Sequence, residues 1–217
     1  NYNDPEYPKN DDGSDAEKIK IKIMYSIFCR LLDFVGIYFE KPVDFQLNLQ
    51  FFIDLANTDD KKIRCLTLFL IGNMFESMPE TINMMMSLEF FNLVDCYIEE
   101  SDNETRMESY ICCSTAICFC DNETRNYFIE NGFLSQLFET ISTLDDQILY
   151  MLVNAITRMI ETINIEKGPY EALEAFREAS EDDISTIQFS VKNNAKAIEA
   201  LDKMMCVVNG IAKSIEE

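Results

Sequence analysis

The sequence predicts an all-α protein in which repeated helical units stack into a solenoid. From about Ala16 onward, apolar residues recur at helical spacing and only short polar turns separate the helical segments. Six Gly and five Pro among 217 residues are too few for an all-β protein with its many tight turns. Similar segments recur about 40 residues apart, and a helical unit of this length buries its apolar residues only when neighbouring units stack on it.

The chain divides into three predicted regions. Residues 1–15 are polar and acidic and lack periodic apolar residues, so we expect a disordered acidic tail rather than a signal peptide. Residues 16–195 are predicted to form the repeat solenoid. Residues 196–217 are predicted to continue a long C-terminal helix that caps it.

A shift of 43 residues aligns the two central units. Glu80-Thr-Ile-Asn83 corresponds to Glu123-Thr-Arg-Asn126, and both segments precede an apolar helix at the same distance. Four pairs of apolar residues follow with the same shift: Phe90 with Phe133, Phe91 with Leu134, Val94 with Leu137, and Ile98 with Ile141.

Three helices are predicted within one unit. A long helix covers about Glu104–Cys120, a short helix about Glu123–Glu130, and a third helix about Phe133–Ser142. Asn131-Gly132 is expected to end the short helix, because Gly commonly follows the last turn. The long helix of the next unit is expected to follow Asp145-Asp146 and to end near Ile163.

Acidic segments mark where helices begin. Asp59-Asp60, Asp145-Asp146 and Asp182-Asp183 each precede a longer apolar helix, where a carboxylate can accept hydrogen bonds from free N–H groups. Asn103-Glu-Thr105 and Asn122-Glu-Thr124 match the glycosylation sequon. Both also lie at predicted helix starts, and this position favours a capping role.

The residues from Asp121 to Glu161 resemble the armadillo repeat. The Ile129–Gly132 turn, the Phe133–Ile141 helix and the Leu149–Ile156 segment follow its pattern, and the resemblance extends over about residues 17–195. The resemblance implies a right-handed α-solenoid of about four to five armadillo-like repeats. It also implies that the long third helix of each unit lines a concave groove. HEAT-like repeats are the nearest alternative and have nearly the same consequences.

Aromatic residues recur on the long helices at spacings of 39 to 41 residues, beginning at Phe28, and a polar residue follows most of them four positions later. Residues i and i+4 share one helix face. An Asn amide can hydrogen-bond both the N–H and the C=O of an extended peptide, and a ring can stack on the stem of Lys or Arg. We therefore predict a peptide-binding ladder of four pairs: Phe69 with Asn73, Tyr110 with Ser114, Tyr150 with Asn154, and Phe189 with Asn193.

Nuclear-import adaptors with armadillo repeats hold basic localisation signals on a similar ladder of Trp and Asn. The present sequence has a similar spacing but contains no Trp, and Leu32 follows the first aromatic where the ladder would have Asn. The alternative interpretation is that the aromatic residues repeat with the unit because they fill the core.

Charge indicates the kind of partner. The chain has 39 acidic and 18 basic residues, a formal net charge of -21, which repels nucleic acid and anionic lipid and attracts basic partners. We predict an acidic groove that binds an extended basic segment of a protein, with no nucleic-acid or membrane partner. The alternative is that the acidity only keeps the protein soluble.

Catalysis and metal binding are not expected. The sequence lacks His, which is the commonest general base and metal ligand, and it contains no Gly-rich phosphate loop. All eight Cys lie in apolar helical segments, which favours buried thiols and a reducing cytoplasmic or nuclear compartment. Zinc pairs normally lie on turns, whereas neighbouring helical positions point about 100° apart. This geometry argues against a metal site among Cys112, Cys113, Cys118 and Cys120.

The C-terminal region shows a seven-residue repeat of apolar positions. It predicts a long amphipathic helix that either caps the solenoid or forms a coiled-coil dimer. The second hypothesis for function is therefore a scaffold or co-chaperone that binds a folded partner, or a second copy of itself, through its convex face or this helix. The repeat consists of Ile184, Val191, Ile198, Met205 and Ala212, with Ile187, Asn194, Leu201, Val208 and Ile215 three positions later.

Overall fold

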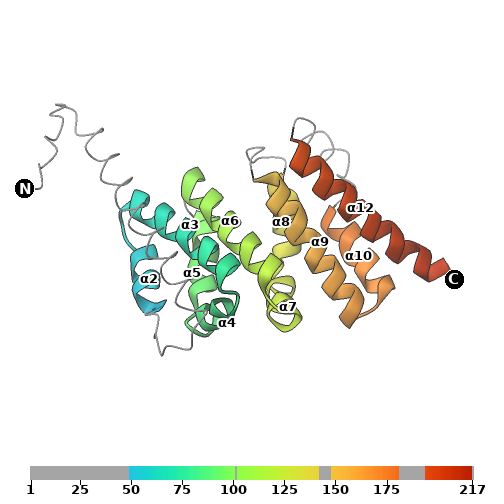
Figure 1. Cartoon of the computed structure of the whole chain (residues 1–217), viewed down its shortest axis with the longest axis horizontal. Coiled ribbons are helices and arrows are strands. Elements are labelled where there is room, and N and C mark those ends of the chain that lie inside the picture. The colour runs from blue at the N-terminus through green and yellow to red at the C-terminus, as the bar shows by residue number, and fades with distance from the viewer. Residues whose placement is uncertain (1–48, 101, 142–147, 181–193, 217) are drawn as a thin grey trace, which may run out of the picture. The chain divides into compact units, whose positions relative to one another are not determined.

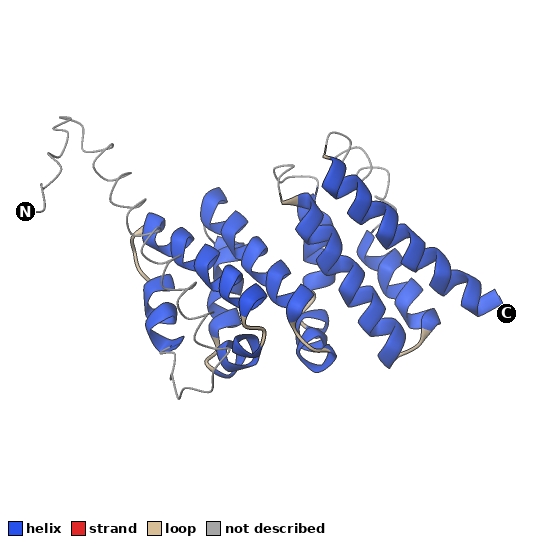
Figure 2. Ribbon diagram, in the orientation of Figure 1, coloured by secondary structure: helices blue, strands red, loops and turns tan. Residues whose placement is uncertain are grey.

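The structure is a computed structural model that describes residues 49–100, 102–141, 148–180 and 194–216. The chain divides into two compact units, Asn1–Leu47 and Asn48–Glu217, and all the described residues belong to the second. Every regular element among them is a helix, as Figure 2 shows. The predicted tail at residues 1–15 lies outside the described residues.

The long helices form one layer, which we call the long-helix layer. Neighbours in this layer are α3 against α6, α6 against α9, and α9 against α12 (Figure 1). The layer therefore places side by side segments that are 40 or more residues apart in the sequence. It consists of α3 (Lys61–Ser77), α6 (Asn103–Phe119), α9 (Leu149–Glu166) and α12 (Ala195–Glu216).

Shorter helices pack against this layer. α5 packs on α6, α8 packs on α9, and α10 packs on both α9 and α12. Within the described residues, two complete three-helix units can be followed, α4–α6 and α7–α9. This part of the chain is an all-α solenoid of armadillo-like repeats. The shorter helices are α2 (Leu49–Ala56), α4 (Glu80–Ser87), α5 (Phe90–Glu100), α7 (Asn122–Glu130), α8 (Phe133–Ile141) and α10 (Pro169–Ser180).

The 43-residue shift between the two units is confirmed. Helix α5 begins at Phe90 and α8 begins at Phe133, as the aligned apolar residues predicted. Gly132 follows α7 with a φ of 79°, a left-handed conformation that suits Gly. Its counterpart before α5 is Glu89, which has a φ of 59° although it carries a side chain.

Carboxylates cap the helix starts where the sequence predicted it. Asp60 accepts hydrogen bonds from the backbone N–H groups of Lys62 and Ile63 at 2.9 and 3.2 Å. At the two sequons the capping side chain belongs to the preceding residue, Asp102 for α6 and Asp121 for α7. The pairs at 145–146 and 182–183 lie outside the described residues.

Aromatic rings in mostly edge-to-face contact connect α3, α5, α7 and α8 through the core. Phe75 of α3 contacts Phe90 and Phe91 of α5, with ring centroids 6.3 and 5.9 Å apart. Phe91 contacts Phe128 of α7, which contacts Phe133 of α8, at 4.9 and 5.4 Å. All five rings are buried. Each large apolar side chain buried in this way contributes about 1.5–3 kcal/mol, so the contacts hold successive repeats together.

The C-terminal helix lies along the solenoid but with a different buried face from the predicted one. The predicted register places Ile198, Met205 and Ala212 in the core, whereas Ile198 is 39% exposed. This first set of positions is shifted by one residue, to Ala197, Met204 and Ile211, whereas Leu201 and Val208 of the second predicted set are buried as predicted. Helix α12 packs against two helices, α9 and α10, rather than along one seam. Its buried side chains are Ala197, Ala200, Leu201, Met204, Val208 and Ile211.

The start of α12 lies at Ala195. Asn194 begins α12 by accepting a hydrogen bond from the Ala197 N–H at 3.1 Å, and the predicted helical residues Ile184 to Val191 lie outside the described part of the chain.

None of the described helices combines the length and the apolarity that a bilayer crossing requires.

Candidate functional site

The first described pair of the ladder lies on α3. Phe69 and Asn73 are both half-buried, and they share one helix face. The Asn73 side-chain amide donates a hydrogen bond to the carbonyl of Phe69, with Nδ2 to O at 2.9 Å. Part of the hydrogen-bonding capacity predicted for a peptide is therefore already used within the helix.

The second pair is buried and does not face a partner. Tyr110 and Ser114 on α6 are 6% and 0% exposed, and burial raises the pKa of Tyr110. The ladder assumed a shift of 41 residues, but α3 and α6 begin at Lys61 and Asn103, which are 42 residues apart. One residue rotates a helical position by about 100°, which turns these side chains away from the accessible face.

The correct register on α6 gives different side chains. With a shift of 42 residues, Phe69 corresponds to Ile111 and Asn73 corresponds to Thr115. The Thr115 hydroxyl donates to the Ile111 carbonyl at 2.9 Å, much as the Asn73 amide bonds back to the carbonyl of Phe69. A polar side chain on this face therefore recurs between the two helices, although the residue type does not.

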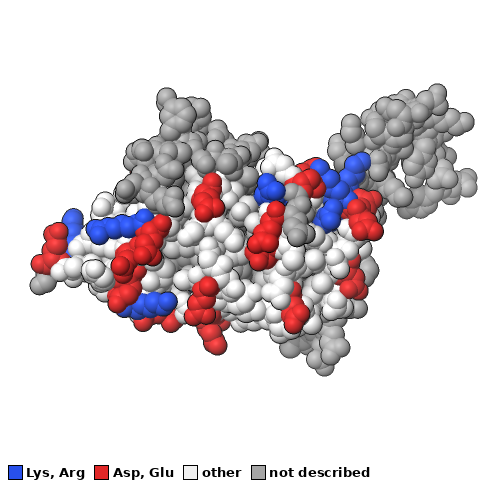
Figure 3. Space-filling model, turned by 180° about the vertical axis from the view of Figure 1, so that it is seen from behind, with Lys and Arg blue, Asp and Glu red and all other residues white. Residues whose placement is uncertain are grey.

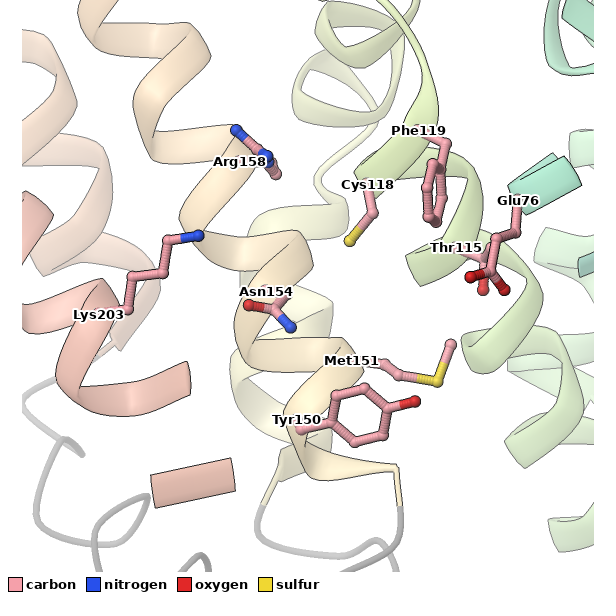
Figure 4. A pocket seen from close by; sticks show the side chains of 9 residues that line it. All are labelled: Glu76, Thr115, Cys118, Phe119, Tyr150, Met151, Asn154, Arg158 and Lys203. Atoms are coloured by element: carbon pink, nitrogen blue, oxygen red, sulfur yellow. The ribbon is translucent and has the colours of Figure 1, made fainter. Parts of the chain in front are cut away.

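The third pair lines a cavity on the long-helix layer. Tyr150 and Asn154 of α9 project into a cavity of about 320 Å³ (Figure 4). Among the residues that the structure describes, no hydrogen bond joins the Asn154 amide to another group. The wall consists of Glu76 from α3, Thr115, Cys118 and Phe119 from α6, Tyr150, Met151, Asn154 and Arg158 from α9, and Lys203 from α12.

The remaining predicted pairs cannot be placed. Phe189 and Asn193 lie outside the described residues, as do Phe28 and Leu32 at the start of the series. Their position in the ladder stays a prediction. The structure brings only the α9 pair into the cavity, together with Thr115 as the counterpart of Asn73.

Two cationic side chains, Arg158 and Lys203, and one carboxylate, Glu76, line the cavity. Figure 4 shows Arg158 and Lys203 on one side of it and Glu76 on the other. Arg158 forms an ion pair with Glu161 at 3.1 Å, and Lys196 lies over the Tyr150 ring with Nζ 5.6 Å from its centroid. This cavity is one part of the surface along the long helices, so the acidic groove stays a prediction.

Acidic side chains are spread over the described part of one face of the molecule. Figure 3 shows one face of the molecule, on which acidic side chains are scattered with uncharged surface between them. Acidic and basic side chains also lie beside each other at several places on that face. On this face the acidic side chains therefore do not gather into one patch.

Cys118 contributes a thiol, a possible nucleophile, to the cavity wall. Burial raises the pKa of its thiol to about 11, although Arg158 and Lys203 act in the opposite direction. The thiol is therefore protonated at neutral pH and is a poor nucleophile. No hydrogen bond between described residues joins Cys118 or Thr115 to Glu76, so the cavity wall contains no paired nucleophile and base.

The other cysteines of the predicted cluster are buried. Cys112, Cys113 and Cys120 lie in the core, and burial raises the pKa of all three thiols. Within the described part of the chain, no group of three or more Cys, Asp or Glu side chains is arranged to hold a metal ion.

Sequence reasoning missed the charged members of the cavity. Arg158 follows Asn154 by four residues, so it lies on the same face of α9, and continuing the ladder by one turn would have found it. Lys203 had no such signal, because it comes from α12 and depends on how that helix packs against α9.

Comparisons with known proteins concern the fold. No family model matches the sequence, and no curated protein matches it. The structure is similar to an engineered protein from the Northeast Structural Genomics Consortium, with 13% identity and a TM-score of 0.47 over 70% of this chain. That match covers 62% of the engineered protein, so the chain spans less than two thirds of its length.

A second similar structure is a designed armadillo repeat protein. It is 11% identical, with a TM-score of 0.47, and the match covers 72% of this chain and 80% of the designed protein. The helices and contacts of the present structure by themselves make it an armadillo-like solenoid.

Proposed function

We propose that the chain is a non-enzymatic adaptor that holds an extended segment of a partner protein along the long-helix layer. The observation that carries this proposal is the cavity into which Tyr150 and Asn154 project. A ring and an amide on one helix face can bind the side chain and the backbone of the same extended segment. Exposed Phe119 adds apolar surface beside them, with 42% of its area accessible.

The partner segment is expected to be basic as a whole. The net charge of -21 attracts basic chains over long distances and raises their rate of association. Glu76 supplies a carboxylate on the α3 side of the cavity, where a Lys or Arg side chain could bind. Because salt screens such attraction over about 10 Å at 0.1 M, affinity should fall as salt is added.

A second surface favours the alternative function. A cavity of about 360 Å³ lies between α10 and α12, and exposed Tyr170 and Ile215 line it together with Leu173. Exposed apolar side chains around a hollow are typical of a protein-binding surface. A folded partner that binds the C-terminal helix would use this surface instead of the long-helix layer.

A selection of random linear peptides on the immobilised protein tests both proposals. The selected peptides are then measured against two matched double variants, Tyr150→Ala with Asn154→Ala, and Tyr170→Ala with Ile215→Ala. If the proposal holds, the first variant weakens binding about tenfold or more, equivalent to about 1.4 kcal/mol, and the second leaves it unchanged.

The opposite pattern would move the site to α10 and α12. If no linear peptide is enriched, the protein does not bind an extended segment and the proposal is wrong. Circular dichroism of each variant provides the control that the helices are intact, since Tyr150 and Asn154 are only half-buried.

A further inference from the structure

The cavity between α6, α9 and α12 differs in charge from the chain as a whole. We propose that it accepts an acidic side chain of the partner segment, with Arg158 and Lys203 as the groups that bind the carboxylate. This inference rests on the proposed function, because it specifies the chemistry of one side chain within the bound segment.

The two cations come from neighbouring helices of the layer. Arg158 projects from α9 and Lys203 projects from α12, and Figure 4 shows the Lys203 ammonium directed toward α9 on the same side of the cavity as Arg158. Asn154 lies one turn before Arg158 on the same face. A carboxylate there could accept hydrogen bonds from a guanidinium, an ammonium and an amide.

Both cations retain donors for a ligand. The ion pair between Arg158 and Glu161 is exposed, and exposed pairs contribute only about 0–1 kcal/mol, so a ligand can compete with it. The guanidinium also has five N–H donors, more than one carboxylate uses. Within the described part of the chain, Lys203 forms no ion pair.

The field of the two cations reaches the cavity wall. Arg158 and Lys203 each favour the thiolate of Cys118, although burial has the larger effect on this pKa. The same field would stabilise the negative charge of a ligand carboxylate in the cavity. On the opposite, α3 side of the cavity, the carboxylate of Glu76 disfavours an anion.

The two sides of the cavity therefore differ in charge. An acidic side chain is favoured toward α9 and α12, and a basic side chain is favoured toward α3. A segment with one acidic residue among basic ones satisfies both the local charge of the cavity and the total charge of the chain.

The experiment compares peptides selected on the wild type with those selected on Arg158→Glu with Lys203→Glu. The matched control is Lys167→Glu with Lys213→Glu, which changes the net charge by the same amount at exposed positions outside both cavities. The peptides are measured with amidated C-termini, so that any carboxylate belongs to a side chain.

We expect the wild type and the control to select Asp or Glu at one constant position. Replacing that residue by Asn or Gln should weaken binding about tenfold, and the cavity variant should select Lys or Arg there instead. Thermal unfolding of both charge variants shows that the exposed substitutions leave the fold intact.

Three results would overturn the inference. Peptides that depend on Tyr150 and Asn154 but have no constant acidic residue would refute it while the proposed function stands. An unchanged preference in the cavity variant would do the same. If no peptide depends on Tyr150 and Asn154, the proposed function and this inference both fail.

Discussion

The pentapeptide Asp-Asn-Glu-Thr-Arg occurs twice, at residues 102–106 and 121–125, and both copies fold in the same way. Asp102 accepts from the Thr105 N–H at 3.2 Å, and Asp121 accepts from the Thr124 N–H at 2.8 Å. The Arg of each copy then donates its Nε–H to a carbonyl eight residues earlier in the chain. The helix start and the Arg that caps the preceding helix are therefore properties of the local sequence.

The surroundings of the two Arg side chains differ. Arg106 is half-buried, and its Nε lies 2.9 Å from the Ile98 oxygen. Arg125 is only 7% exposed and lies where α6, α7 and α9 meet. It donates to the carbonyls of Ile117 and Cys120 and to the side chains of Asn122 and Thr162. The same five residues therefore make a helix cap in one place and the junction between two repeats in the other.

Arg125→Ala should give the largest effect. The substitution removes the hydrogen bonds that Arg125 donates to the carbonyls of Ile117 and Cys120. It also leaves a cavity where α6, α7 and α9 meet. We expect a loss of about 3 kcal/mol in the free energy of unfolding, measured by urea denaturation. Arg106→Ala, as the matched control, should lose about 1 kcal/mol. Equal losses would show that the junction adds nothing to the cap.

A pH-dependent prediction distinguishes the copies further along each helix. Glu108 lies six residues after Asp102 in the first copy, and Tyr127 occupies the corresponding position after Asp121 in the second. Burial, and then the nearby charge of Glu104, raise the pKa of Glu108 from 4.5 to about 7, and its Oε2 has no hydrogen-bond partner. The folded state therefore holds this proton more tightly than the unfolded state, so stability falls as pH rises from 4.5 to about 7.

Glu108→Gln should remove this dependence. Because Glu108 is partly exposed, we reduce the free energy that corresponds to its pKa shift. The variant should then be about 1–2 kcal/mol more stable than the wild type above neutral pH, and almost equally stable near pH 4.5. Urea denaturation of the wild type and the variant at both pH values checks it. A gain of the same size at both pH values would mean that the charge of Glu108 is not responsible.

The smallest expected effect concerns the matching turns of the two units. Glu89 and Gly132 both adopt positive φ, but only Gly does so without strain. Glu89→Gly should therefore stabilise the protein by about 0.5–1 kcal/mol, seen as a higher midpoint of thermal unfolding. Gly132→Ala should destabilise it by a similar amount, through the backbone alone, because a Cβ there meets no atom within 4 Å. A Glu89→Ala variant, which keeps the strain, should show no gain.

Local sequence was sufficient for most helix boundaries. The cap at Asp60, the turn at Gly132 and the starts of α5 and α8 depend on residues a few positions apart, whose chemistry is read directly from the chain. The apolar repeat was also sufficient for the fold class, since a 43-residue helical unit must stack on its neighbours.

Tertiary packing decided which side chains are accessible. Tyr110 and Ser114 fit the ladder by spacing, but a difference of one residue in register rotates them into the core. On α12, Leu201 and Val208 are buried as the repeat predicted, but Ala197 and Met204 are buried in place of Ile198 and Met205, because two helices rather than one cover this helix. The cavity that brings Arg158 beside Lys203 joins helices far apart in sequence, and neither residue alone indicates the other. A repeat pattern determines where helices form, whereas the rotation of each helix depends on all of its neighbours, and that rotation determines the binding surface.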